Sequence, residues 1–305
     1  MFSNVYLSMS DYYTQEISNK ILRKRNVSLF IKRIDKNNKH ISGNKLYKLK
    51  YNLIQAKKEG HNSVLTFGGA FSNHIAATAY AAQENKLNSI GIIRGEEHKE
   101  LNHTLNFAKS NSMKLCYLNR KEYRLKHTQD VMDYLNQKFG DFYLIPEGGT
   151  NLLGVKGAYE ILDTSKDQHD FICCSVGTGG TIAGIIQKSL ESQKVLGFSV
   201  LKSSNKLMLD MTKWVDKKKN WKLILDYHFG GYAKINEELI NFVYEFNNRY
   251  NIHLDIIYTA KMFYGIIDLV QKDYFPKGSS ILAIHTGGLQ GNIGMNQRFN
   301  LNLPF

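Results

Sequence analysis

Lys45 stands in the segment SGNKLYKLKY, where its position could give it a chemistry that the other lysines lack. Three leucines spaced three and four residues apart predict a helix that begins at about Asn44 (Leu46, Leu49 and Leu53). Lys45 then lies in the first turn, where the positive end of the helix dipole disfavours an ammonium. A free amine can attack a carbonyl compound, so Lys45 is a candidate nucleophile. From this segment alone, an ordinary surface lysine is the alternative.

A possible phosphate site lies between residues 170 and 187, where an apolar strand, a glycine-threonine turn and an apolar helix follow one another. The backbone N–H groups of such a turn can close around an anion, which the helix dipole also favours. The turn comprises Gly177, Thr178, Gly179, Gly180 and Thr181. It matches neither the G-x-G-x-x-G pattern nor a P-loop. A tight structural turn is the alternative, but it would not need the two threonine hydroxyls.

A second anion site is indicated where a strand ends at Gly68 and Gly69 and a helix starts near Phe71. Side chains in or beside the first turn of a helix can join its free N–H groups in binding a carboxylate. These side chains belong to Ser72, Asn73 and His74. An ordinary helix cap is an equally good interpretation of this stretch.

Two further glycine pairs follow predicted strands, at residues 148–149 and at residues 287–288, the latter directly after Thr286. Each pair is weak evidence by itself. Together, the four strand-to-glycine turns predict a site lined by backbone and small polar groups, which suits a flat, phosphorylated cofactor.

The elements that must position these turns alternate between apolar strands and segments of helical periodicity along the whole chain. This alternation predicts an α/β protein made of two doubly wound parallel-sheet units with helices on both faces. Ligands of such sheets bind beyond the carboxyl ends of the strands, where the glycine turns lie. We expect a large cofactor-binding domain formed by residues 1–45 and 157–305, and a small mobile substrate-side domain formed by residues 46–156.

Composition narrows the class of protein. The chain has 305 residues, of which 43% are apolar, and a net charge of +13. Its lysines are scattered, so we expect a solvated surface and no nucleic-acid partner. No apolar run is long enough to cross a membrane, and the N-terminus does not resemble a signal peptide, so we expect no membrane partner and a cytoplasmic location. Cys116, Cys173 and Cys174 are predicted to be buried packing residues, and no metal site is expected.

Taken together, the motifs resemble one family, the pyridoxal-phosphate-dependent 1-aminocyclopropane-1-carboxylate deaminases and D-cysteine desulfhydrases. The resemblance runs from about FIKRID to HTGGLQG, and the motifs occur in the order of the family: SGNKLYKL, GGAFSNH, IPEGGTN, GTGGTIAG, FGGYAKINEEL, IYTAKMFYGIIDL and IHTGGLQG. It implies the tryptophan synthase β-like fold, also called fold type II, with pyridoxal 5'-phosphate as cofactor. It also implies a small amino acid as substrate and a homodimer.

The resemblance also implies roles for single residues. Lys45 would bond to the cofactor's aldehyde, and the turn of residues 177–181 would hold its phosphate. Asn73 would bond the phenolic oxygen of the ring, and Ser72 would bind the substrate carboxylate or move protons near the α-carbon. The remaining implied site residues are His74 and Thr259 on the substrate side, Tyr232 and Tyr258 as the two active-site tyrosines, and Thr286 facing the pyridine nitrogen.

Thr259 and Thr286 match the desulfhydrases, whereas the deaminase pattern has a glutamate and a leucine there. A hydroxyl at the pyridine nitrogen supports a more neutral ring, which favours β-elimination. The sequence therefore predicts a lyase that converts D-cysteine, or a related β-substituted amino acid, into pyruvate, ammonia and sulfide. The alternatives are a 1-aminocyclopropane-1-carboxylate deaminase and a pyridoxal-phosphate-binding homologue without turnover. A basic nucleic-acid-binding protein is a third and more distant alternative.

Overall fold

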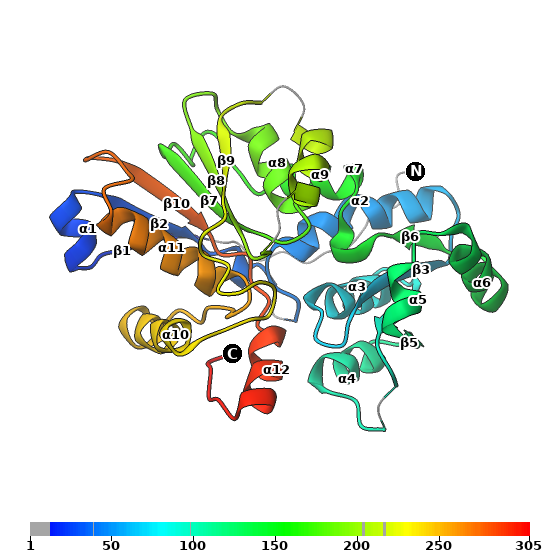
Figure 1. Cartoon of the computed structure of the whole chain (residues 1–305). Helices are drawn as coiled ribbons and strands as arrows, with labels where there is room; N and C mark the ends of the chain where they lie inside the picture. The colour runs from blue at the N-terminus through cyan, green and yellow to red at the C-terminus, as the bar shows by residue number, and fades with distance from the viewer. Residues whose placement is uncertain (1–12, 39, 98, 203–204, 216–217) are drawn as a thin grey trace.

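The computed structural model describes residues 13–38, 40–97, 99–202, 205–215 and 218–305. It contains two β-sheets, each covered by helices, that lie side by side (Figure 1). The larger sheet has the strand order β1-β2-β10-β7-β8-β9. All neighbouring pairs are parallel except β1 and β2. The strands are β1 (Thr14–Ile17), β2 (Ser28–Lys32), β7 (Phe171–Val176), β8 (Lys194–Ser199), β9 (Trp221–Ile224) and β10 (Ser280–Ile284).

Helices cover both faces of the larger sheet. One face packs against α1 (Lys20–Arg25), α10 (Glu237–Tyr250) and α11 (Thr259–Gln271), and the other against α7 (Leu152–Tyr159), α8 (Gly180–Lys188) and α9 (Asn205–Val215). Successive strand residues point to opposite faces, so Cys173 belongs to the first core and Cys174 to the second. The predicted burial of the cysteines is confirmed, since Cys116, Cys173 and Cys174 are all buried and free.

The smaller sheet has the order β5-β4-β3-β6, and all its pairs are parallel. Its strands are β3 (Ser63–Gly69), β4 (Asn88–Arg94), β5 (Met113–Leu118) and β6 (Tyr143–Ile145). The helices around it are α2 (Asn44–Lys58), α3 (Asn73–Glu84), α4 (His103–Ser110), α5 (Arg120–Arg124) and α6 (Gln129–Phe139). The final helix, α12 (Gln290–Phe299), follows the larger sheet in sequence but contacts α4 beside the smaller one (Figure 1). The predicted fold class is therefore confirmed.

The expected division into domains stays a prediction, with which the positions of the strands are compatible. All four strands of the smaller sheet lie within residues 46–156, and all six strands of the larger sheet lie outside that range. Helix α7 spans the expected boundary and packs on both α2 and α8. The exact boundaries, and the mobility of the smaller domain, stay predictions.

The backbones of α2 and α7 approach each other closely where the two helices cross. A Cβ atom added at Gly157 would lie 1.8 Å from the Tyr47 carbonyl oxygen. We therefore expect Gly157→Ala to lower the free energy of unfolding by about 2 kcal/mol or more, because overpacking outweighs the gain in helix propensity. Chemical unfolding measures the effect. Gly69→Ala is the matched control, since its added atom would come no closer than 3.7 Å to Arg94. Equal denaturant midpoints of unfolding for the two variants would contradict the close contact of Gly157 with the Tyr47 backbone.

No helix within the described ranges is long and apolar enough to span a membrane.

Candidate active site

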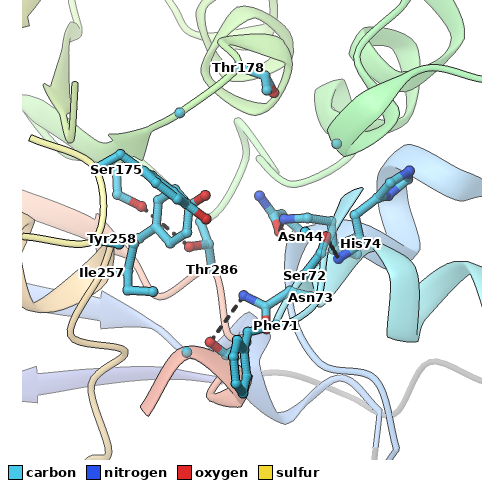
Figure 2. A pocket seen from close by; sticks show the side chains of 18 of the residues that line it. Asn44, Phe71, Ser72, Asn73, His74, Ser175, Thr178, Ile257, Tyr258 and Thr286 are labelled. Carbon is cyan, nitrogen blue, oxygen red and sulfur yellow. Dashed lines mark hydrogen bonds between the residues drawn. The ribbon is translucent and has the colours of Figure 1, made fainter. Parts of the chain in front are cut away.

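The carboxyl ends of strands from both sheets open onto one cavity of about 470 Å³. Figure 2 shows Ser175, Tyr258 and Thr286 on one side of this cavity and Ser72 and Asn73 on the other. Most residues predicted for the site line it: Lys45, Ser72, Asn73, His74, Gly177, Thr178, Gly179, Thr181, Tyr232, Tyr258 and Thr286. Six segments that are separated in sequence thus meet at one place.

Helix α2 begins at Asn44 as predicted, and its start is held against the end of β10. The Asn44 N–H donates to the Thr286 carbonyl oxygen at 3.2 Å. The preceding residue, Gly43, has φ +82°, and a Cβ there would lie 1.8 Å from the same oxygen. Only glycine permits this approach, which sets Lys45 beside the segment that follows β10 and contains Thr286.

Lys45 is tied to the glycine-threonine turn through Asn44. Its Nζ donates to Asn44 Oδ1 at 2.8 Å, and Asn44 Nδ2 donates to Thr181 Oγ1 at 2.7 Å. Burial lowers the pKa of Lys45 to about 8, although the nearby Asp255 acts in the opposite direction. The direction agrees with the prediction from the helix dipole, but burial is the main physical cause. A larger fraction of this amine is therefore neutral near pH 8 than for an exposed lysine.

The turn of residues 177–181 leads into α8, and no side chain caps the N-terminus of that helix. Gly179 adopts φ +85°, and a Cβ at Gly180 would come within 3.0 Å of Lys48 Nζ and of Thr150. Uncapped N–H groups with space before them suit an anion. Gly180 does not line the cavity surface itself but lies under it, against Lys48 and Thr150.

Lys48 and Thr150 are polar groups at this turn that the sequence reasoning missed. Lys48 Nζ donates to Thr150 Oγ1 at 2.8 Å, and the hydroxyls of Thr150 and Thr178 are 2.5 Å apart. Lys48 is buried, and burial followed by the charge of Lys45 holds its pKa well below the ordinary value. The available signal was its spacing, because a residue three positions after Lys45 shares its face of the helix.

Ser72 caps α3 on the opposite side of the cavity. Its Oγ accepts from the backbone N–H groups of His74 and Ile75 at 3.2 and 3.4 Å. Asn73 Nδ2 donates to the Gly288 carbonyl oxygen at 3.2 Å, while its Oδ1 is buried without a hydrogen-bond partner. Ser72 is therefore a helix cap, and the unsatisfied Asn73 oxygen, which is an acceptor, suits a hydrogen-bond donor and not a carboxylate.

His74 lines the cavity, but its ring is bound to the protein. Nε2 lies 2.9 Å from Thr66 Oγ1, and that hydroxyl donates to the Ile145 carbonyl oxygen. Thr66 must then accept from Nε2–H, which assigns the tautomer. Burial, and then the charges of Lys48 and Lys45, hold the pKa of His74 well below its ordinary value. A neutral, fixed imidazole is suited to orienting the start of α3 more than to exchanging protons.

Hydroxyl groups form the wall opposite α3. Ser175 Oγ and Thr286 Oγ1 are 3.4 Å apart, and both residues line the cavity. The rings of Tyr232 and Tyr258 meet edge to face with their centroids 5.9 Å apart. Burial raises the pKa of Tyr258 well above its ordinary value and also raises that of Tyr232, so both phenols keep their protons near neutral pH. Ser175 was not among the predicted site residues.

Thr259 lies outside the cavity lining. It is fully buried at the first position of α11, where its hydroxyl accepts from the Asp255 N–H at 2.9 Å and is 3.2 Å from the Asp255 carbonyl oxygen. Because that hydroxyl is committed to the backbone, the arrangement gives no support to the substrate contact predicted for Thr259.

The mouth of the cavity has two cations that the sequence analysis did not single out, Arg94 from β4 and Arg298 from α12. Both are exposed, and neither has an ion-pair partner within the described ranges. Such a mouth attracts anionic small molecules by long-range electrostatics.

The groups around the cavity fit pyridoxal phosphate. An uncapped helix end with glycines and a neighbouring lysine suits the phosphate, and an amine of lowered pKa suits the aldehyde. The buried Asn73 amide, with its unsatisfied oxygen, can meet a polar substituent of the ring, and the hydroxyls of Ser175 and Thr286 can meet a ring nitrogen.

Comparisons with known proteins agree with this chemistry. The family model described as pyridoxal-phosphate dependent enzyme matches residues 15–287. A Pyrococcus abyssi protein provisionally named 1-aminocyclopropane-1-carboxylate deaminase is 32% identical, aligning 89% of this chain with 88% of its own length. The bifunctional D-cysteine desulfhydrase/1-aminocyclopropane-1-carboxylate deaminase of Arabidopsis thaliana is 31% identical, over 86% of this chain and 73% of its own. A solved structure of an ACC deaminase homologue is 28% identical with a TM-score of 0.85, covering 97% of this chain and 95% of its own.

Proposed function

The chain belongs to the pyridoxal-phosphate-dependent enzymes, and from this premise we propose that it cleaves a small β-substituted amino acid such as D-cysteine. The balanced reaction converts D-cysteine and water into pyruvate, ammonia and hydrogen sulfide. The observation that supports this choice is that Ser175 and Thr286 line this wall of the cavity with hydroxyl groups and not with a carboxylate. Glu147, the one carboxylate lining the described part of the cavity, is bound to Tyr123 and Lys126. A hydroxyl partner leaves a pyridine ring more neutral, which suits elimination.

The proposed cofactor contacts follow from the fit. The N–H groups of the turn at residues 177–181 and the Lys48 ammonium would hold the phosphate, and Asn73 would bond the phenolic oxygen. Lys45 would bond to the aldehyde. When bound, the cofactor supplies an electron sink that makes the α-hydrogen of an amino acid acidic.

The chain's own groups would then bind the substrate and move its protons. The N-terminus of α3 with Ser72 would bind the substrate carboxylate, and the Lys45 amine would take and return a proton at the α-carbon. The phenols of Tyr232 and Tyr258, which keep their protons, can donate hydrogen bonds to the leaving group. Closure of the smaller domain over the larger would exclude water during these steps.

A second candidate is opening of 1-aminocyclopropane-1-carboxylate. It is favoured by the names of the Pyrococcus abyssi relative and of the solved ACC deaminase homologue, and the Arabidopsis thaliana relative carries both activities in its name. The same amine, helix terminus and tyrosine pair would serve either substrate, so the choice between them requires a direct assay.

The decisive assay compares two products from the purified, cofactor-loaded protein. Sulfide released from D-cysteine faster than ammonia from the cyclopropane acid supports the first proposal, with L-cysteine as the stereochemical control. The reverse order supports the second candidate. If the loaded protein is inactive toward both and toward a broad panel of amino acids, the enzymatic proposals are wrong.

Cofactor loading should depend on pH through Lys45. The neutral amine is the nucleophile, and its pKa is lowered to about 8 in the unloaded protein. The loading rate should therefore rise about tenfold per pH unit below that value and level off above it. Stopped-flow absorbance of the unloaded protein mixed with pyridoxal phosphate measures this rate. A rate that does not change between about pH 6 and pH 9 would contradict the role of this amine.

We also propose a homodimer in the cytoplasm. Leu152 of α7 and Leu209 of α9 are 71% and 66% exposed, on helices that cover the same face of the larger sheet. Exposed leucines of this kind support a partner surface, and the three buried free thiols suit a reducing compartment. Analytical ultracentrifugation measures the assembly state.

A further inference from the structure

The loop that carries Tyr232 has an unusual backbone. Phe229, Gly230, Gly231 and Ala233 all have positive φ angles, of 52, 90, 121 and 54°. Two of these residues are not glycine, so the conformation costs free energy and must be held by its surroundings. Tyr232 lies in the middle of this run and is 45% exposed at the cavity.

One buried ammonium holds the loop. Lys261 is 1% exposed, and its Nζ donates to the carbonyl oxygens of His228 and Gly231 at 2.9 and 2.8 Å. The second of these carbonyls belongs to the residue directly before Tyr232. The same carbonyls also accept backbone hydrogen bonds within the loop, from the N–H groups of Gly231 and Lys234 respectively.

Lys261 also belongs to the element that carries the other tyrosine. It lies in the first turn of α11, three residues after Tyr258, which is the residue preceding that helix. Its ammonium therefore connects the start of α11, which follows Tyr258, with the loop that carries Tyr232. A displacement of either attachment would change the edge-to-face contact of the two rings.

Asp255 supplies the opposite charge. It is fully buried, and its Oδ1 accepts from the Tyr258 N–H at 2.6 Å, while Oδ2 has no hydrogen-bond partner. Burial raises the pKa of Asp255 to about 7, and the charges of Lys261 and Lys45 oppose this rise. Burial lowers the pKa of Lys261 to about 8, opposed by Asp255. The two groups thus stabilise each other's charge inside the protein, where an unpaired charge is costly.

We propose that Lys261 is a positioning residue, whose ammonium fixes the loop of residues 228–233 and so sets the Tyr232 phenol against Tyr258 at the reaction site. The kinetic part of this inference rests on the proposed function. Its structural part does not, because the order of the loop can be measured without turnover.

The first test is a double-mutant cycle between Lys261 and Tyr232. Lys261→Met keeps the apolar stem and removes the donors, and we expect kcat to fall roughly 10- to 100-fold. Tyr232→Phe should cost little more in the Lys261→Met background, because the phenol is already misplaced there. Lys213→Met, at a lysine that is 69% exposed on α9, is the matched control and should retain wild-type activity. Fully additive losses from the two substitutions would overturn the proposal.

The second test is hydrogen exchange of the cofactor-loaded protein, followed by mass spectrometry of peptides covering residues 226–236. Lys261→Met should speed exchange at the Gly231 and Lys234 amides, which bond to the carbonyls that the ammonium holds. Unchanged exchange would overturn the proposal whether or not the wild type is active. If Lys261→Met does not fold, Lys261→Gln retains a neutral amide N–H₂ group as donor and should give the same effects in smaller measure. An enzyme inactive on every amino acid, with exchange altered as expected, would reject only the proposed function.

Discussion

Replacing Lys45 by alanine should lower kcat by about 10³-fold or more, while leaving the phosphate site largely intact. Lys45 would supply both the amine that bonds to the cofactor's aldehyde and the base at the α-carbon. The variant loses both functions at once, and no other residue is expected to replace them. The phosphate site should persist because its N–H groups come from the turn at residues 177–181 and from α8, not from the Lys45 side chain. Pyruvate release measures turnover.

Two measurements isolate the role of Lys45. Borohydride followed by peptide mass analysis should attach the cofactor to Lys45 in the wild type and leave the variant unlabelled there. Lys50→Ala is the matched control, because Lys50 lies on the same helix but pairs with Glu160 outside the cavity. A Lys45→Ala enzyme that forms pyruvate at the wild-type rate would show that another residue carries the chemistry.

The strands and helices could be predicted from local pattern because each has one dominant face. Leu46, Leu49 and Leu53 are fully buried, as their spacing requires, and α2 begins at Asn44. The proximity of glycine turns within each sheet also followed from the sequence, since the carboxyl ends of parallel strands lie at one edge of a sheet. That the edges of both sheets face one cavity is seen only in the structure. The turns are separated by many residues, yet the topology of the fold brings them together.

What the sequence could not indicate are contacts between segments whose side chains have no shared local pattern. Lys48 meets Thr150 across 102 positions, and Lys261 meets His228 across 33. Among 40 lysines and arginines, spacing places Lys48 on the helix face of Lys45, but no local pattern marks Lys261 as buried. Thr259 shows that a sequence motif can also predict a contact that the fold does not make. The motif predicts Thr259 at the site, but at the start of α11 its hydroxyl bonds to the Asp255 backbone.

Two lysines of this cavity lie in surroundings that disfavour their charge. Lys45 and Lys48 are one helical turn apart, and burial lowers the pKa of both. Two lysines that repel each other at a buried site cost free energy in the unloaded protein. A bound phosphate dianion would offset that cost. The cofactor is therefore expected to stabilise the fold as well as to supply the chemistry.

The contribution of Lys48 to that binding can be isolated with two ligands. We expect Lys48→Met to weaken binding of pyridoxal phosphate by about 10- to 150-fold, since a charge-assisted hydrogen bond contributes about 1.5–3 kcal/mol. Binding of pyridoxal, which lacks the phosphate, should change little or improve, because removing one buried ammonium relieves its repulsion of Lys45. Titration of the unloaded protein, followed by fluorescence, gives both affinities.

Lys50→Met provides the matched control for this comparison, because it removes an ammonium from the same helix without reaching the cavity. If Lys48→Met weakened both ligands equally, Lys48 would support the site as a whole and the phosphate assignment would be wrong. A loss confined to the phosphorylated ligand would place the phosphate between Lys48 and the uncapped start of α8. That position would in turn direct the aldehyde end of the cofactor toward Lys45, because the turn and Lys45 are joined through Asn44.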